Sequence, residues 1–260
     1  MRYQPLSRRL INLIYPLVIY MAIGMAVLGL YPNGGLMANL IEKVSCIIIM
    51  GILFYKDSKQ IRWEGKKLSL YSVIIMIIIG ICACIGVNML FELTGLKTIR
   101  EEDAKNVAKA LYSDKLWLQI LVVGIAAPVA EELLFRGILY RRMRTWLSVG
   151  PSALAALLIF AAVHGNLLQA LYAFILGALL VWTYERFAKL TAPIILHVSA
   201  NLISILVQQS TWLSSYLQTY AVAACIIGLA GTAAGVVYYS SRISRKLLHR
   251  GAFINSNFCI

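Results

Sequence analysis

Apolar runs of roughly 20 residues recur along the whole chain, and they constrain its fold more than any other feature. A helix of about 20 residues spans the hydrocarbon core of a bilayer, so each run has the length of a membrane helix. Only 13% of the 260 residues are charged, whereas about 25% are charged in an average soluble domain. Too few charges remain to cover a water-facing surface, so we expect an integral membrane protein rather than a large soluble helical core.

The runs predict an all-α fold, a polytopic transmembrane helix bundle of about eight membrane helices. They cover Leu10–Leu30, Leu36–Tyr55, Leu68–Phe91, Leu116–Tyr140, Pro151–His164, Leu167–Tyr184, Pro193–Val207 and Tyr220–Tyr239. The fifth and seventh are short for a full span. Within one integral domain we distinguish residues 1–115 with three membrane helices and an outer loop, residues 116–210 with helices four to seven, and residues 211–260 with the last helix and a basic tail. Small residues at Gly228, Gly231 and Gly235 predict close helix packing on one face of that last helix.

The formal net charge of +13 would suggest nucleic-acid binding in a soluble protein. Here the basic residues stand in short clusters between apolar runs, where they set orientation in a bilayer. One side of the draft topology holds 17 of the 24: Arg2, Arg8, Arg9, Lys56, Lys59, Arg62, Lys66, Lys67, Arg141, Arg142, Arg144, Arg186, Lys189, Arg242, Arg245, Lys246 and Arg250. The other side holds five, Lys97, Arg100, Lys105, Lys109 and Lys115, which share a loop with acidic residues. The positive-inside rule then predicts cytoplasmic termini, and we expect a lipid bilayer and no nucleic acid as partner.

Charged residues are concentrated in the fourth run, where each costs roughly 2.5–3.5 kcal/mol on insertion scales and so needs a partner or a function. Glu132 and Arg136 are four residues apart, share a helix face and can form an ion pair. Glu131 is rotated by about 100° and has no obvious local cation. A carboxyl group in a low-dielectric environment becomes a competent general base near neutral pH. The alternative interpretation is a packing ion pair with a spare acid that faces water.

Two of the three histidines also lie in membrane runs. His164 follows Phe160 by one helical turn, and it could equally be a hydrogen-bonded core residue. His197 and Asn201 are four residues apart, so imidazole and carboxamide share a helix face. Two donors that converge on one point would stabilise an oxyanion, although the same pair could form a polar clamp between helices. Polar clusters on three helices of one bundle together favour a hydrolytic site.

A metal site is the competing interpretation of these residues. The HExxH motif is absent, so the sequence does not predict a zincin-type site. Glu131, His164 and His197 could still supply three zinc ligands with an open fourth position. The histidines fall on separate helices, and no ligand pair has the i, i+4 spacing that pre-forms many helical zinc sites. We therefore expect no cofactor, with zinc as the alternative.

Three motifs now resemble those of a known family, the CAAX-processing and bacteriocin-processing (CPBP, or Abi) intramembrane proteases. That family shows EExxxR, FxxxH and HxxxN or HxxxD in this order. The chain carries Glu131-Glu132-Leu-Leu-Phe-Arg136, then Phe160-Ala-Ala-Val-His164, then His197-Val-Ser-Ala-Asn201. The resemblance covers about Leu116 to Leu206, and no motif residue departs from the family pattern.

The resemblance implies an intramembrane endopeptidase in a helical bundle whose cavity opens toward the cytoplasm. It implies that Glu131 and His164 activate a water, that His197 and Asn201 bind the oxyanion, and that Glu132 and Arg136 hold the fourth helix in place. Substrates would be membrane-associated peptides or proteins, either prenylated or of the bacteriocin or signal type. Short length and compact loops are typical of a bacterial member, so we expect a bacterial plasma membrane protein. A non-proteolytic immunity or scaffold protein, and less so a transporter, are the alternatives.

Overall fold

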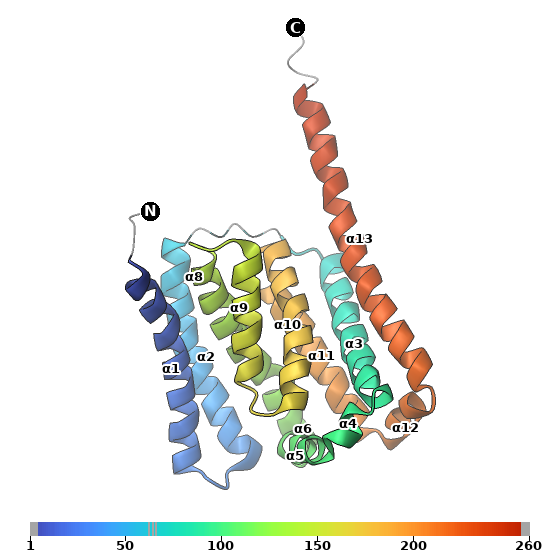
Figure 1. Ribbon diagram of the computed structural model, residues 1–260. Helices are drawn as coiled ribbons and strands as arrows, with labels where there is room; N and C mark the ends of the chain where they lie inside the picture. Colours follow the sequence, from blue (N-terminus) through green and yellow to red (C-terminus); the bar gives the residue numbers. More distant parts are fainter. Residues whose placement is uncertain (1–4, 62, 64, 66, 256–260) are drawn as a thin grey trace.

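A computed structural model shows a bundle of helices arranged side by side (Figure 1). It describes residues 5–61, 63, 65 and 67–255, with the backbone alone for residues 242–255. Within that part the chain forms helices and no strand. Seven helices are long and apolar enough to cross a membrane: α1 (Leu6–Leu30), α2 (Gly35–Gln60), α3 (Leu70–Leu93), a composite helix (Leu116–Met143), α10 (Leu167–Phe187), α11 (Thr191–Gln209) and the Ala221–Ser241 part of α13 (Ala221–Asn255). The prediction of a polytopic helical membrane bundle is confirmed.

One predicted membrane helix is shorter than a full span. The fifth run forms α9 (Val149–Ala162), with 14 residues, which is about 21 Å of helix against a hydrocarbon core of about 30 Å. The seventh run, which also looked short, forms the 19-residue α11 and meets the length of a span. α9 lies beside α10 within the bundle (Figure 1).

The composite helix is continuous and contains two π-helical segments. It consists of α6 (Leu116–Gln119), η1 (Ile120–Ala126), α7 (Ala127–Glu132), η2 (Leu133–Tyr140) and α8 (Arg141–Met143). The two η segments are π-helical, a conformation that is rare overall and frequent at functional sites. They lie on either side of the Glu131-Glu132 pair, in the segment for which the sequence predicted a site.

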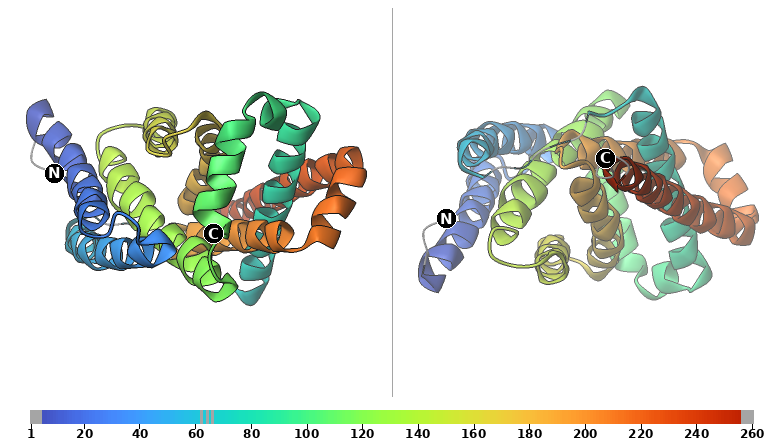
Figure 2. Two further views of the ribbon diagram at one scale, coloured as in Figure 1. Left: turned by 90° about the horizontal axis from the view of Figure 1, so that it is seen from below. Right: turned by 90° about the horizontal axis from the view of Figure 1, so that it is seen from above.

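Short helices cover the end of the bundle that lies opposite the chain termini. These are α4 (Leu96–Ile99), α5 (Glu101–Tyr112) and α12 (Thr211–Thr219) (Figures 1 and 2). Acidic side chains occupy the first turn of α5, where they complement the positive end of the helix dipole. The long polar loop of the sequence thus forms an amphipathic helix at this end of the bundle.

Close packing of α3 against α13 bears out the prediction for the glycine-bearing face of the last helix. A Cβ atom added at Gly228 would lie 2.6 Å from the Cα atom of Gly86 on α3. Added Cβ atoms at Gly231 and Gly235 would meet the side chains of Cys82 and Ile79. The two backbones therefore approach each other at distances that only glycine permits.

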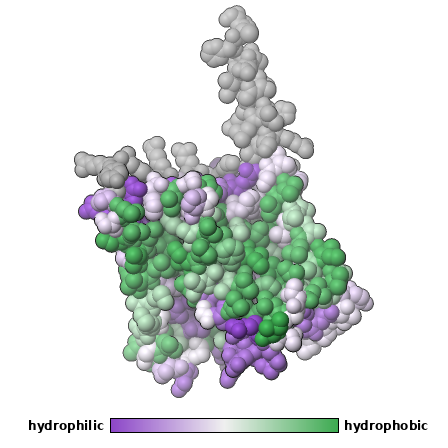
Figure 3. All heavy atoms as spheres, in the orientation of Figure 1, coloured by the Kyte–Doolittle hydropathy of each residue, from purple (hydrophilic) through white to green (hydrophobic). Residues whose placement is uncertain are grey.

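Charge is distributed between the two ends of the bundle, and an apolar band lies between them (Figure 3). The start of α1 and the ends of α2, α8 and α10 lie at the end that carries the N-terminus (Figure 1), and the described basic residues of the larger group lie there. Arg2, Arg62 and Lys66 lie outside the described residues, and so do the side chains of Arg242, Arg245, Lys246 and Arg250. The protein is an integral membrane protein, and the cytoplasmic side of the termini stays a prediction.

Candidate active site

The ion pair predicted between Glu132 and Arg136 forms in the interior of the bundle. Arg136 Nη1 lies 2.9 Å from Glu132 Oε1, and both side chains are 0% exposed. Arg136 Nη2 also donates to the backbone carbonyl of Gly177 on α10 at 3.3 Å. A Cβ atom at position 177 would lie 2.8 Å from Leu157 and 3.3 Å from Arg136 Nη2. The absence of a side chain at Gly177 therefore provides the space that the buried Arg136 guanidinium occupies.

Phe160 is packed at the centre of the motif residues. The Arg136 guanidinium lies over its ring, 4.4 Å from the ring centroid. The Phe160 ring is also nearly perpendicular to the rings of His164 and His197, and its centroid lies 4.9 Å and 6.2 Å from theirs. The phenylalanine of the second motif thus sets the positions of both histidines and covers the buried cation.

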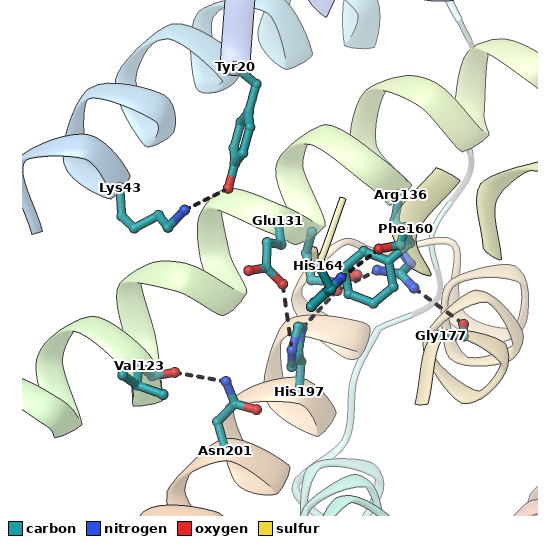
Figure 4. Close-up of polar contacts among 11 residues, drawn as sticks. Tyr20, Lys43, Val123, Glu131, Arg136, Phe160, His164, Gly177, His197 and Asn201 are labelled. Atoms are coloured by element: carbon teal, nitrogen blue, oxygen red, sulfur yellow. Dashed lines mark hydrogen bonds and ion pairs between the residues drawn. The ribbon is translucent and has the colours of Figure 1, made fainter. Parts of the chain in front are cut away.

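His197 on α11 contacts both glutamates, and Figure 4 shows it below Glu131. Its Nδ1 atom is 3.0 Å from Glu132 Oε1, and its Nε2 atom is 3.8 Å from Glu131 Oε2. The His197 side chain is 6% exposed, and that of Glu131 is 19% exposed. The first and third motifs therefore meet through this imidazole, a pairing that the spacing of residues within each helix does not predict.

Asn201 contacts the composite helix rather than His197. Its Nδ2 atom donates to the backbone carbonyl of Val123 at 2.8 Å (Figure 4). That carbonyl receives no backbone hydrogen bond from its own helix. In the π register the N–H of Ala127 bonds to the carbonyl of Val122, and the next residue, Pro128, has no N–H to donate to Val123. One amide hydrogen of Asn201 replaces the missing bond and ties α11 to η1. The polar-clamp interpretation describes this contact, and the oxyanion role of Asn201 stays a prediction.

Glu131 and His164 line a common cavity of about 580 Å³. His164 lies just after α9, and its Nδ1 atom is 2.6 Å from the backbone oxygen of Phe160. His197 and Asn201 do not line this cavity. The four predicted catalytic residues are therefore divided between the cavity wall and the packed helices behind it.

Comparison with known proteins finds a family model that resembles the central part of the chain. The family model of type II CAAX prenyl endopeptidase Rce1-like proteins matches residues 113–203, which contain all three motifs. The chain is similar to this family over that stretch, and we call residues 113–203 the Rce1-like segment. The resemblance to CAAX-processing proteases seen in the motifs is confirmed, and the match supports a membrane protease of the CAAX type.

Relatives outside the family model extend the likeness to more of the chain. "Putative membrane peptidase YdiL" of Bacillus subtilis is 22% identical over 174 residues, which cover 65% of this chain and 70% of that protein. "Uncharacterized protein YpbD" of the same organism is 25% identical over 56% of this chain and 76% of its own length. An "Uncharacterized 24.3 kDa protein" of Escherichia coli is 33% identical, over 37% of this chain and 48% of its own. No solved structure matches the chain.

The wall of the cavity that faces Glu131 comes from helices outside the Rce1-like segment. Lys43 on α2 lies 2.8 Å from Glu42 Oε1 and 3.2 Å from the Tyr20 hydroxyl of α1. Lys43 lines the same cavity as Glu131, so a cation from a distant part of the sequence stands near a carboxylate that has no obvious local one. The cation comes from another helix and could not be found by helical spacing around Glu131. The available signal was the adjacent pair Glu42-Lys43 inside an apolar run, because charges at membrane depth are rarely without function.

The position of the cavity conflicts with one expectation. It is lined by the end of α1, the start of α2 and Ala110 of α5, so it lies in the half of the bundle opposite the termini (Figure 1). A cavity that opens toward the cytoplasm and termini that lie in the cytoplasm are therefore incompatible in this fold. The resemblance carried the first expectation from the family, whereas the second rests on this chain's own charges.

The Rce1-like site does not assemble a metal-ligand cluster. No group of three or more histidine, cysteine, aspartate or glutamate side chains is placed to hold a metal ion within residues 5–255, positions 62, 64, 66 and the side chains after 241 aside. Glu131, His164 and His197 are therefore not grouped as a three-ligand site in this structure, and the zinc alternative stays a prediction. Nδ1 of His164 is bonded to the Phe160 carbonyl, which leaves Nε2 free, an arrangement that is also usual for histidines that bind a metal.

Proposed function

We propose that this protein is an intramembrane endopeptidase that hydrolyses peptide bonds of membrane-associated substrates with a water activated by Glu131. The observation that carries the proposal is the cavity: a carboxylate and an imidazole, Glu131 and His164, face one space inside an apolar helical bundle. A peptide of a membrane-associated substrate, prenylated or of the bacteriocin or signal type, would enter this space.

In the proposed reaction Glu131 takes a proton from water while the water oxygen bonds to the carbonyl carbon of the substrate. His164 accepts a hydrogen bond from the same water through its free Nε2 atom. The carbonyl electron pair moves onto oxygen, and His197 and Asn201 stabilise this charge. The C–N bond then breaks, and the proton that Glu131 took from the water is delivered to the amine nitrogen, which completes hydrolysis without a cofactor.

The test is incubation of the purified protein in lipid nanodiscs with lipidated peptides, and product masses are measured. Cleavage by the natural chain and no cleavage by Glu131→Gln support the proposal, with Glu101→Gln as a matched control on the exposed face of α5. Equal processing of a substrate by Glu131→Gln would show that Glu131 is not the base. A biological activity that persists in cells expressing Glu131→Gln, with no cleavage by either protein, would show that the protein acts by binding as an immunity or scaffold protein.

The role of zinc is tested on the same preparation. Glutamate-dependent hydrolysis predicts full activity after chelator washing, with no metal retained by mass spectrometry. About one zinc per active chain would make Glu131, His164 and His197 ligands after a rearrangement of the site, and the glutamate-base proposal would be wrong.

We further propose that both termini are cytoplasmic, on the basis of the basic clusters at their end of the bundle. Reporter fusions at Arg144 should then report the cytoplasm, and a fusion at Lys105 the other side. Opposite reporter signals would show that the protein has the reverse orientation, with the cavity on the cytoplasmic side.

A further inference from the structure

Each histidine of the site has one ring nitrogen bonded to a group that can only accept a hydrogen bond. For His164 this is the Phe160 backbone carbonyl, 2.6 Å from Nδ1. A carbonyl has no proton to give, so Nδ1 of His164 carries the hydrogen. A neutral imidazole has only one N–H, and Nε2 of His164 is therefore a proton acceptor.

His197 is fixed in the same way by a side chain. Its Nδ1 atom is 3.0 Å from Glu132 Oε1, the oxygen that also lies 2.9 Å from Arg136 Nη1. Arginine stays charged in proteins, and its buried carboxylate partner is then an acceptor only. Nδ1 of His197 carries the hydrogen, so the lone pair is on Nε2, the atom 3.8 Å from Glu131 Oε2.

We propose that Glu132 is a positioning residue: together with Arg136 it fixes His197 in the tautomer with hydrogen on Nδ1, and Nε2 enters the reaction as a proton acceptor. The consequence for catalysis rests on the proposed function. His197 can donate to an oxyanion only after its Nε2 has gained a proton, and the attacking water supplies that proton through Glu131. The proton then leaves with the amine when the C–N bond breaks, so no other proton source is required.

The tautomer can be measured on the resting protein without any substrate. We would label histidine with nitrogen-15, place the protein in lipid nanodiscs and record NMR spectra at a pH where the rings are neutral. His249→Gln removes the third histidine, and His164→Gln assigns the remaining signals. Both His164 and His197 should show a protonated Nδ1 and an unprotonated Nε2. A hydrogen on Nε2 of His197 overturns the proposal.

Paired variants then identify the group responsible. Glu132→Leu combined with Arg136→Met removes the acceptor without leaving a buried charge, and His197 should change from one tautomer to a mixture. Glu132→Gln combined with Arg136→Met retains an amide oxygen and should restore the Nδ1–H form. His164 is the internal control, because its partner is backbone, and its signals should not change. A His197 that keeps Nδ1–H in the Leu–Met variant shows that Glu132 does not set the tautomer.

The outcome is independent of proteolysis. If no peptide is cleaved but the tautomers are as expected, the proposed function fails and the positioning role of Glu132 stands. If Glu131→Gln abolishes cleavage but His197 carries its hydrogen on Nε2, the protease stands and the role of Glu132 does not.

Discussion

Glu131 and Glu132 are consecutive residues, yet they occupy two different environments. Glu131 lines the cavity with His164 and is 19% exposed, whereas Glu132 is 0% exposed and holds Arg136 and His197. A helix turns consecutive residues by about 100°, so one turn can face both a cavity and a packed interface. The first carboxylate is open to the cavity, whereas the second is enclosed by protein.

The contrast extends to the two histidines and divides the motif residues into two groups. His164 faces the cavity with Glu131, and His197 is packed beside Glu132 behind it. Substitution on the cavity side should reduce turnover with little effect on folding. Substitution on the packed side should reduce stability, and activity should fall as a consequence.

The largest effect is expected for Glu131→Gln, which keeps the shape of the side chain and removes the proton acceptor. Turnover should fall by roughly 10²–10⁴-fold, the usual contribution of a general base. The yield of folded protein should match that of the natural chain, because Glu131 makes no buried ion pair with arginine. Single-turnover kinetics and size-exclusion chromatography measure the two quantities, and a large loss of yield would erase the contrast between the two glutamates.

Arg136→Ala should act mainly on stability. It leaves Glu132 buried without its cation, which costs about 3–5 kcal/mol for a broken buried pair. Thermal unfolding in detergent should therefore shift strongly, and yield should fall with activity. The double change Glu132→Leu with Arg136→Met should recover part of the yield but not the activity. An Arg136→Ala protein that folds normally would show that the buried pair does not support the fold.

Asn201→Ala tests the clamp between α11 and the composite helix. The Val123 carbonyl would lose its donor, which costs about 1–3 kcal/mol for a buried group left unpaired. Pro128→Ala restores a backbone N–H in the π register, so the double variant Pro128→Ala with Asn201→Ala should regain stability. Equal unfolding temperatures for the single and double variants would show that Pro128 is not the reason for the clamp. Activity that stays low in the stabilised double variant would favour the oxyanion role.

Sequence reasoning found the bundle, the motif residues and the Glu132–Arg136 pair because each follows from local periodicity. Apolar runs report membrane helices directly, and i, i+4 spacing brings Glu132 to Arg136. Contacts between helices could not be derived in this way. Three features depend on how distant helices pack: the pairing of His197 with Glu132, the space at Gly177 and the shared cavity of Lys43 and Glu131. The partner of Asn201 depends on a π-helical register that no spacing rule predicts.

The smallest effect is expected for the cavity wall outside the Rce1-like segment. A variant in this wall tests whether residues of α1 and α2 take part in catalysis. Lys43 is the cation on this wall; it lines the cavity together with Glu131 and bonds to Tyr20 and Glu42. Negative charge grows on the substrate carbonyl in the transition state, and a fixed cation in a low-dielectric cavity lowers its cost. Lys43→Met should therefore reduce kcat/KM by about tenfold, which corresponds to about 1.4 kcal/mol.

A matched variant separates this effect from a general loss of charge in α2. Lys59→Met removes a lysine from the same helix, but Lys59 lies over the Tyr55 ring at the other end, and kcat/KM should stay at the natural value. Glu42→Gln combined with Lys43→Met removes the unpaired acid that the single change leaves, so it should restore yield without restoring kcat/KM. Lys43→Arg keeps the charge and should retain most of the activity. If Lys43→Met and Lys59→Met are equally active, the α1–α2 wall only encloses the cavity, and the chemistry belongs to the Rce1-like helices alone.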